Sequence, residues 1–480
     1  MTFHAEEHLT RRGLGAIILL FVVLASYYNL VTPIFEASDE VYHYPYVHHV
    51  ATEYRLPVQD PDDIQLWRQE GSQPPLYYLL SAAATVWIDT GDFLQRLVHN
   101  PHAKIGIPLA PDNKNLVVHT TDEQFPYRGT TLAVHIIRLL STLMGAGSVV
   151  LAFFIVREVL PGSKLLPLMA AAITAFNPMF LFISASVNND NLTVLLCSLA
   201  LWQILRLLRH GATPGRVVGI GVVVGLAILT KMSAIGLLVL VALAITWDAV
   251  HRRSSVRTWL GYGLLAASLV AAIGGWWYVR NWLLYGDLMG FNAWLAIAGT
   301  RERAPTAASL LAEFEGFRIS YWGLFGGVNV LMHPLLYKVY DTLSALAVIG
   351  LLVGGVRWLG QQRRQSWRTI LSEHYPRIAQ LSILALWPLI LLAALVRWTS
   401  LTEASQGRLI FPAIAAVSFW LALGWQILAP RRWRKVALTG VATELLIIAV
   451  MVPLAFIAPA YTLPASTFTL PDTLEPLNIT

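Results

Sequence analysis

Apolar segments separated by short polar ones make up most of the chain, and eleven of them are interpreted as membrane spans. A helix that crosses a bilayer needs about 20 predominantly apolar residues, because the hydrocarbon core is about 30 Å thick. The predicted spans are Leu14–Ile34, Thr131–Val156, Leu165–Ser184, Leu192–Leu208, Val217–Thr230, Ile235–Val250, Trp259–Tyr278, Leu335–Arg357, Ile378–Val396, Leu409–Leu428 and Val436–Ala458. The sequence therefore predicts an all-α polytopic membrane protein with about 11 transmembrane helices.

Two of these segments are short, and Lys231 lies between them. A single long helix through Val217–Thr230 and Ile235–Val250 is the alternative. It would place a lysine in the middle of the bilayer at a cost of several kcal/mol. We therefore expect two helices with Lys231 at their junction.

Basic residues mark one side of the membrane. With eleven spans, the following fall on the same side: Arg11, Arg12, Arg157, Lys164, Arg206, Arg209, Arg216, Arg252, Arg253, Arg257, Arg363, Arg364, Arg368 and the run Arg431–Lys435. Loops rich in Lys and Arg are cytoplasmic by the positive-inside rule. The N-terminus is thus expected in the cytoplasm, and the tail 459–480 on the extracytoplasmic side.

The predicted transmembrane domain, 1–458, has two long loops on the outer side, 36–130 and 281–332. The first contains Pro-rich turns and apolar pieces too short to span, such as Leu76–Ile88. Such pieces are typical of helices that lie in the interface, where Trp and Tyr are enriched. Loops of this length are usually functional.

Composition excludes several classes of protein. The chain is 56% hydrophobic and 13% charged, whereas a soluble domain has about 25% charged residues. Cys197, the lone cysteine, allows neither a disulfide framework nor a cysteine metal site. The net charge of +6 is spread over the loops, so we expect no nucleic-acid partner. The first apolar segment has no small-residue cleavage site and is interpreted as a retained span.

Asp39 and Glu40 follow the first span directly. A carboxylate near the interface could act as a general base; the alternative is an acidic first turn favoured by the helix macrodipole. His43 lies one turn beyond Asp39 on the same face. Together with His48 or His49 these residues could ligate a divalent metal, but histidines in a tyrosine-rich amphipathic helix are more often surface residues, and no cofactor is required.

Further candidates lie in or near the outer side. Glu70 and Gln73 precede the interfacial helix, and Glu70 is a second candidate carboxylate or an ordinary helix-start acid. Arg138 lies inside the second span, where a charge is either functional or reaches the interface by its long side chain. Asn189 and Asp190 belong to a polar turn between two spans, which could line a cavity or be a tight turn without function.

Lys231, Arg280 and Arg408 each lie at the outer end of a span. The positive-inside rule disfavours cations there, so a functional reason is expected. Three cations at the depth of Asp39 would suit a phosphate or diphosphate head group. Nearby Trp and Tyr residues could line a sugar or an isoprenoid chain, or form an ordinary aromatic belt.

An ordered set of motifs resembles the membrane glycosyltransferases of the GT-C superfamily, in particular a predicted group with a DE motif in the first outer loop. The motifs are FEASDEVYHYPYV, EGSQPPLYYLL, FPYRGTTLAVHIIRLLS, SVNNDNL, LTKMSAIGL, WWYVRNWLLYGD, SYWGLFGG and QGRLIFPAI. They extend from about residue 12 to about residue 430. The resemblance is more distant to the protein O-mannosyltransferases, and the large soluble C-terminal domain of many relatives has no counterpart here.

The resemblance implies an inverting enzyme of the cell envelope that moves a sugar from a polyprenyl-phosphate donor to a glycan, lipid or protein acceptor on the extracytoplasmic face of a bacterial or archaeal plasma membrane. Asp39 would be the general base, with Glu40 and Glu70 in the catalytic site. Arg138, Lys231, Arg280 and Arg408 would bind the donor phosphate. The predicted substrate-binding residues are His43, Gln73, Asn189, Asp190, Asn281 and Gln406.

Two other classes of function remain open from the sequence. A transporter or flippase of lipid-linked glycans would also use outer cations and apolar grooves, but its charges are expected near the membrane midplane. The inverted repeat of many transporters is not visible. A non-catalytic scaffold would not require the acids and cations of distant motifs to converge.

Overall fold

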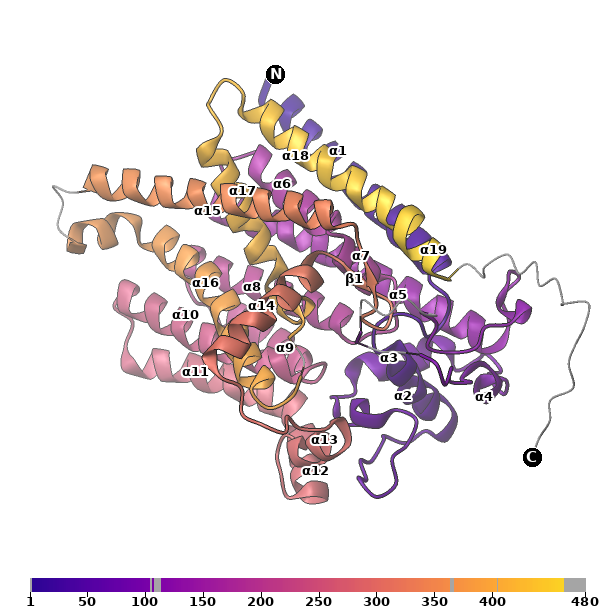
Figure 1. Ribbon diagram of the computed structural model, residues 1–480. Coiled ribbons are helices and arrows are strands. Elements are labelled where there is room, and N and C mark those ends of the chain that lie inside the picture. The colour runs from indigo at the N-terminus through magenta and orange to yellow at the C-terminus, as the bar shows by residue number, and fades with distance from the viewer. Residues whose placement is uncertain (1, 104–105, 108–113, 363–366, 404, 462–480) are drawn as a thin grey trace, which may run out of the picture.

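The computed structural model describes residues 2–103, 106–107, 114–362, 367–403 and 405–461, and the fold is almost entirely helical (Figure 1). The α-helices are α1 (Thr2–Val31), α2 (Glu40–Glu53), α3 (Leu76–Thr85), α4 (Phe93–Arg96), α5 (Gly129–Val159), α6 (Leu165–Ala175), α7 (Pro178–Ser184), α8 (Asp190–His210), α9 (Pro214–Ile228), α10 (Leu237–Arg252), α11 (Val256–Val270), α12 (Trp276–Tyr285), α13 (Phe291–Ala298), α14 (Ala307–Trp322), α15 (Pro334–Gln362), α16 (Trp367–Thr399), α17 (Ile414–Leu428), α18 (Arg434–Val452) and α19 (Ala458–Tyr461).

Shorter elements complete the fold. The 3₁₀ turns are η1 (Arg68–Ser72), η2 (Thr121–Glu123), η3 (Met232–Gly236) and η5 (Gly407–Ala413), and the π-helical turns are η4 (Ala271–Gly275) and η6 (Pro453–Ile457). Strands β1 (Leu324–Phe325) and β2 (Val330–Leu331) form an antiparallel hairpin, in which Leu324 pairs with Leu331.

The predicted polytopic architecture is confirmed, but the count of eleven spans is not. Nine helices in the described part of the chain are long and apolar enough to cross a membrane. A tenth span results if α6 and α7, which meet at a bend of 64°, count as one. The remaining predicted span is α9, whose 15 residues fall short of the usual length. Each predicted span therefore corresponds to a helix, and the difference lies in the length of α9 and the break between α6 and α7.

The chain turns at Lys231, between α9 and α10. The backbone N–H of Ala212, just before α9, donates to Asp248 near the end of α10, with an N–O distance of 2.9 Å. The start of α9 therefore lies beside the end of α10, and the two helices run in opposite directions. The prediction of two helices, which keeps Lys231 at an end of the bundle, agrees with the structure.

The segment between α1 and α5 forms a cap at one end of the bundle, where α2, α3 and α4 lie together (Figure 1). Glu36 fastens this cap internally. Its carboxylate accepts from the backbone N–H of Leu116 at 2.7 Å and of Val117 at 3.1 Å, and lies 2.9 Å from His119 Nε2. Because the Glu36 side chain is fully buried, these contacts fix residues 114–119 to the end of α1.

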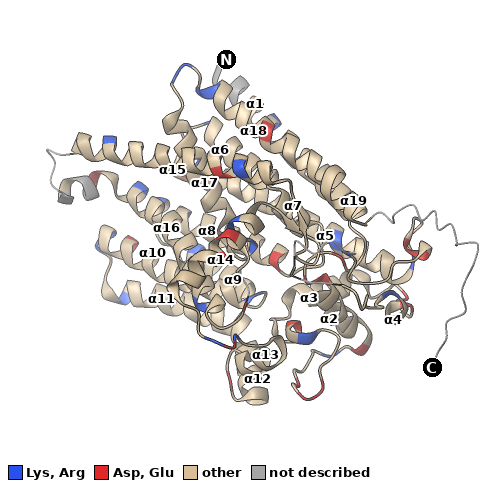
Figure 2. Cartoon of the chain, viewed as in Figure 1, with Lys and Arg blue, Asp and Glu red and all other residues tan. Residues whose placement is uncertain are grey.

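Lys and Arg side chains mark the opposite end, where α10, α11 and α18 carry them near their ends (Figure 2). Arg209 and His210 at the end of α8 pair with Glu158 at the end of α5, at 3.4 Å and 3.1 Å. Arg216 of α9 donates to the carbonyl of Gly211 at 2.7 Å. These contacts place the ends of α5 and α8 together with the start of α9. The predicted tail 459–480 lies outside the described residues from 462 onward.

Candidate functional site

The turn that precedes α2 sends two adjacent carboxylates to different partners. Asp39 has φ 61° and ψ 0°, a left-handed conformation that Asp tolerates better than most residues. Its carbonyl accepts from the N–H groups of Tyr42 and His43, both at 2.9 Å, but its side chain makes no capping hydrogen bond. An Asp at this position usually caps the helix with its carboxylate. Here the carboxylate is left free to contact Arg408 instead.

Asp39 and Arg408 form an ion pair between the start of α2 and η5, residues 369 positions apart in the chain. The Arg408 side chain is 3% exposed and the Asp39 side chain 34%. Arg408 Nε also donates to Gln406 Oε1 at 2.7 Å, whereas its Nη1 is buried without a hydrogen-bond partner in the described part of the chain. Burial tends to raise the pKa of Asp39, but the charge of Arg408, supported by Lys231, holds that pKa below its ordinary value.

A second ion pair joins the N-terminus of α8 to the turn before η3. Lys231 Nζ lies 2.6 Å from Asp190 Oδ1, and Asp190 is almost completely buried. An acidic residue in the first turn of a helix is favoured by the macrodipole. Lys231 and Arg408 both act electrostatically on Asp39, so the two ion pairs belong to one cluster.

Glu70 and His43 lie in the same cluster and are both uncharged at neutral pH. Burial, followed by the nearby charge of Asp39, raises the pKa of Glu70 to about 8. Burial lowers the pKa of His43 to about 3. The 3.6 Å between His43 Nδ1 and Glu70 Oε2 is therefore a contact of neutral groups, and His43 Nδ1 hydrogen-bonds the Tyr78 hydroxyl at 2.8 Å. The cluster thus carries two negative and two positive charges.

Two buried amides, Asn189 beside Asp190 and Asn281 on α12, have unused hydrogen-bonding atoms. Asn189 Nδ2 lies 3.3 Å from Gln73 Oε1, while Asn189 Oδ1 is buried without a hydrogen-bond partner among the described residues. Asn281 is 1% exposed, and neither atom of its amide has a partner there. Unsatisfied buried amides are costly, and a bound polar ligand would supply the missing contacts.

Arg280 flanks the cluster. Its Nη2 donates to the carbonyl of Pro57 at 2.6 Å, and its guanidinium lies 4.7 Å from the centre of the Trp277 ring. Trp277 lines a small cavity of about 30 Å³ together with Gln73, Met232, Trp294 and Trp398. Arg280 Nη1 is buried without a hydrogen-bond partner in the described part of the chain.

Glu40 and Arg138 form a closed pair away from these groups. Glu40 Oε1 accepts from Arg138 Nε at 2.9 Å and from the N–H of Val187 at 2.7 Å, and Oε2 accepts from Arg138 Nη2 at 2.5 Å and from the N–H of Phe35 at 2.9 Å. Both side chains are 0% exposed.

Arg138 has further partners in the backbone at the end of α1. Its Nη1 donates to the carbonyls of Asn29 at 3.0 Å and Thr32 at 2.7 Å, and its Nη2 donates to Pro33 at 2.8 Å. All three guanidinium nitrogens are thus occupied, and no donor faces a phosphate. The sequence predicts Arg138 as a phosphate ligand and Glu40 as a catalytic-site residue. In the structure the two side chains bind each other and the backbone between α1 and α2, and their roles in the site stay predictions.

Of the histidines suggested for a metal, His43 lies near Asp39, whereas His48 and His49 pack on aromatic rings. His48 packs on Phe93 with 4.4 Å between the ring centres, and His49 packs on Trp67 at 4.6 Å. In the part of the chain that the structure describes, no three His, Cys, Asp or Glu side chains are grouped as a metal site. Tyr78, which hydrogen-bonds His43, was not predicted from the sequence. The only signal there is the tyrosine-rich motif in which it lies.

Comparison with known proteins supports the resemblance inferred from the motifs. Residues 133–278 match the family model described as dolichyl-phosphate-mannose-protein mannosyltransferase. The resemblance to GT-C glycosyltransferases is confirmed. The match covers less than a third of the 480 residues. It includes Asp190 and Lys231 but not Asp39, Glu70 or Arg408. No curated protein matches the whole chain or a part of it.

Solved structures of GT-C enzymes resemble the fold at low identity. ArnT from Cupriavidus metallidurans bound to undecaprenyl phosphate has 14% identity and a TM-score of 0.47, with 93% of this chain and 74% of that chain covered. The oligosaccharyltransferase of Archaeoglobus fulgidus has 13% identity and a TM-score of 0.47, covering 93% and 54%. The Pmt1–Pmt2 complex of S. cerevisiae has 14% identity and a TM-score of 0.36, covering 57% and 34%.

Proposed function

We propose that the chain is a glycosyltransferase that moves a sugar from a polyprenyl-phosphate donor to an acceptor hydroxyl. The observation that carries this proposal is the convergence of Asp39, Lys231 and Arg408 at one end of the bundle, with Arg408 Nη1 buried and unpartnered in the described part of the chain. The family matched by residues 133–278 is named for a dolichyl-phosphate donor, which belongs to the same chemical class.

The charge balance explains how a phosphate would bind. Because two carboxylates neutralise two cations, the cluster offers little net charge to an anion. Arg408 Nη1 nevertheless provides a free donor in a buried position. A phosphate that hydrogen-bonds this nitrogen competes with Asp39 for the guanidinium, and Lys231 adds a second positive charge.

Binding of the donor would also activate the base. While Asp39 is paired with Arg408, its pKa lies below the ordinary value and the carboxylate is a weak base. A phosphate that draws the guanidinium away raises the proton affinity of Asp39. The base therefore becomes effective when the donor is in place.

The chemical step needs one base and a phosphate clamp. The acceptor oxygen attacks the anomeric carbon, its proton passes to Asp39, and the bond between that carbon and the phosphate oxygen breaks. The lipid phosphate leaves as an anion, so it needs no proton from an acid. Lys231 and Arg408 stabilise the charge that develops on it. Attack opposite the leaving group inverts the anomeric centre.

Neutral Glu70 and the surrounding amides would orient the sugar. At neutral pH Glu70 carries a proton and can donate a hydrogen bond. Asn189 Oδ1 and the Asn281 amide have unused hydrogen-bonding capacity. The aromatic side chains of Trp277, Trp294 and Trp398 provide the apolar flank expected for a sugar ring or the first isoprene units.

The positive-inside rule places the end with Arg209 and Arg216 in the cytoplasm. The cluster then faces the extracytoplasmic side, as proposed from the sequence. Reaction with an impermeant thiol reagent at Glu70→Cys in intact cells tests this orientation. Labelling only after the cytoplasm is opened would contradict it.

The function is tested by incubating the reconstituted protein with a panel of radiolabelled polyprenyl-phosphate sugars and a membrane extract that contains acceptors. We expect release of polyprenyl phosphate and labelled product from at least one donor, and none with Asp39→Asn. The same panel with nucleotide sugars is the control. Product from a nucleotide sugar alone would contradict the proposed donor class.

A further inference from the structure

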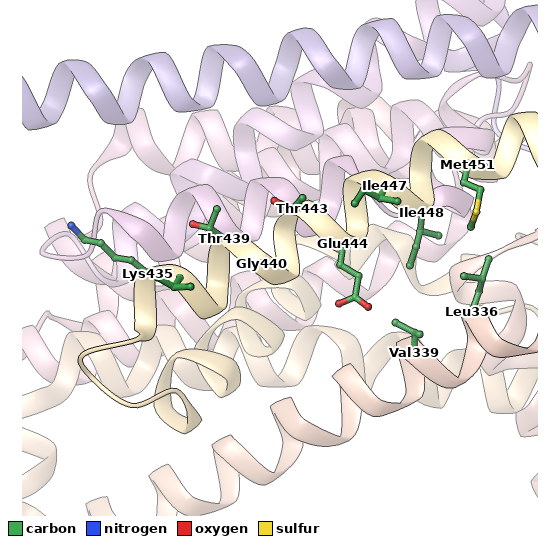
Figure 3. A pocket seen from close by; sticks show the side chains of 11 residues that line it. Leu336, Val339, Lys435, Thr439, Gly440, Thr443, Glu444, Ile447, Ile448 and Met451 are labelled. Atoms are coloured by element: carbon green, nitrogen blue, oxygen red, sulfur yellow. The ribbon is translucent and has the colours of Figure 1, made fainter.

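A wide gap lies between α15 and α18, away from the charged cluster. Its volume is about 770 Å³. One face of α18, including Lys435, Thr439, Thr443 and Ile447, lines most of its length, whereas α15 contributes only Leu336 and Val339 (Figure 3). The two helices approach each other near Leu336 and diverge toward Lys435 (Figure 3).

Glu444 lies in the middle of this face. It is ten residues beyond the start of α18 at Arg434, which corresponds to about 15 Å along the helix axis, or half of the hydrocarbon thickness. Its carboxylate points into the space between α18 and α15 (Figure 3). Glu444 has no hydrogen bond or ion pair to any residue that the structure describes. An unpaired carboxylate at this depth is costly and marks a functional position.

Tyr340 of α15 does not line the gap but is a second polar group without a hydrogen-bond partner among the described residues. Its side chain is fully buried, and its hydroxyl makes no hydrogen bond with the described residues. Among the charged groups, Glu444 acts most strongly on that hydroxyl. Glu444 is therefore the group that offers an acceptor to an occupant of the gap.

The shape of the α18 face suits a helix. Lys435, Thr439, Thr443, Ile447 and Met451 follow at intervals of four residues, the spacing of a helix-packing ridge. Gly440 and the two threonines keep the centre of the face shallow, as in close helix contacts within membranes. From Lys435 to Met451 the face is about 24 Å long, which is most of the hydrocarbon thickness.

The depth of Glu444 in the membrane and its negative charge decide which molecule could occupy the gap. A lipid head group lies at the membrane surface and does not reach Glu444, while an acyl chain offers no partner for a carboxylate. A second copy of this chain also lacks a suitable cation. In the described part of the chain every Lys and Arg of a membrane span lies within about two turns of an end of that span, apart from Arg138, which is buried.

We propose that this gap binds a transmembrane helix of a different protein, which carries one basic side chain near the middle of the membrane. That side chain pairs with Glu444, and the small face around Gly440 allows the two backbones to approach closely. The inference goes beyond the proposed function, because the gap is separate from the cluster of Asp39, Lys231 and Arg408.

Disulfide trapping in phosphatidylcholine vesicles tests the proposal with the full chain. The variant Gly440→Cys carries the reactive thiol. A Cβ added at Gly440 meets no atom within 4 Å, and the native Cys197 is buried. The probes are single-span polyleucine peptides with one central Lys, Leu or Glu and a cysteine four residues before or after it. We expect the Lys peptide to be trapped about 5–30-fold more than the Leu peptide, the range given by 1–2 kcal/mol for a polar contact between membrane helices.

When Glu444→Gln is added to Gly440→Cys, trapping of the Lys peptide should fall to the level of the Leu peptide. With Glu444 intact, the Glu peptide should be trapped least of the three. The comparison among peptides uses one folded protein and does not depend on the stability of Glu444→Gln. Equal trapping of the three peptides would overturn the proposal. Predominant disulfide-linked dimers of the chain itself would do the same, because they would identify a second copy as the occupant.

Discussion

Two neighbouring residues make the same kind of ion pair with opposite consequences. Glu40 pairs with Arg138 in a fully buried site, where every guanidinium nitrogen has a partner. Asp39 pairs with Arg408 at a site where the carboxylate is 34% exposed and Arg408 Nη1 has no partner in the described part of the chain. An ion pair whose guanidinium nitrogens all have partners fixes the backbone, whereas a pair with an unused guanidinium donor can exchange partners. The chemical type of a pair therefore does not indicate its role; the number of unused donors does.

The largest effect is expected for the open pair. Asp39→Asn should lower the rate of sugar transfer about 10²–10⁴-fold, the usual contribution of a general base. The fold should be retained, because the Asp39 side chain does not cap α2 and is 34% exposed, so that solvent reaches its pair with Arg408, unlike the fully buried pair of Glu40. Turnover of the preferred donor and a thermal unfolding scan measure the two properties, with Asp62→Asn in the same loop as the control. An Asp39→Asn protein of full activity would remove the base assignment.

The closed pair should respond in stability rather than chemistry. Glu40→Gln leaves Arg138 buried with an unpaired charge, which costs about 3–5 kcal/mol of unfolding free energy. Denaturant titration in detergent measures this value. Asp341→Asn, which breaks the partly exposed pair with Arg318, is the matched control and should cost at most about 1 kcal/mol. Equal losses for the two variants would show that the buried pair has no special weight.

A smaller effect is expected on donor binding. Arg408→Lys keeps a positive charge beside Asp39 but removes the free Nη1 donor. Loss of one hydrogen bond to a charged group costs about 1.5–3 kcal/mol, so the affinity for polyprenyl phosphate should fall about 10–150-fold. Arg318→Lys is the control, because the partner of Arg318 is Asp341 of α15 and not a member of the cluster, and it should bind as the unaltered protein does. If Arg408→Lys retains the original affinity in equilibrium binding, the phosphate does not use this nitrogen.

The last effect concerns pH. Burial and then the charge of Asp39 raise the pKa of Glu70 from 4.5 to about 8. Between these values the folded chain retains a proton that the unfolded chain releases, so this group's contribution to stability falls as the pH rises from about 4.5 to about 8. The stability of Glu70→Gln minus that of the unaltered protein should therefore be larger at pH 8 than at pH 5. Thermal unfolding at both pH values measures the difference, and Glu53→Gln, exposed on α2, should show none.

Much of the fold could be predicted from hydropathy. Each predicted span corresponds to a helix, and the expected turn at Lys231 follows from the cost of a buried lysine. The length of α9 and the bend between α6 and α7 could not be predicted, because apolar content does not report where the backbone breaks. The cluster could also be predicted from hydropathy. The cations at the ends of spans and the carboxylate after the first span lie at the same depth, so that they can meet there.

The different partners of Asp39 and Glu40 could not be predicted from the sequence. Adjacent acids suggest one site, and only the left-handed backbone at Asp39 sends the second carboxylate to Arg138. The depth of Arg138 could be predicted from its position in the second span, but its partners depend on the backbone carbonyls at the end of α1. Tyr78 was missed because its contact with His43 arises from the packing of α2 on α3.

The shortness of α9 has a consequence for the surrounding lipid. Fifteen residues rise about 22 Å, about 8 Å less than a typical hydrocarbon core. A short helix can be accommodated by local thinning of the bilayer, and we expect such a depression beside Lys231 at the end of α9. Such a depression would lower a phosphate-bearing lipid toward the mouth of the cluster, so that the donor is delivered by the contour of the membrane itself.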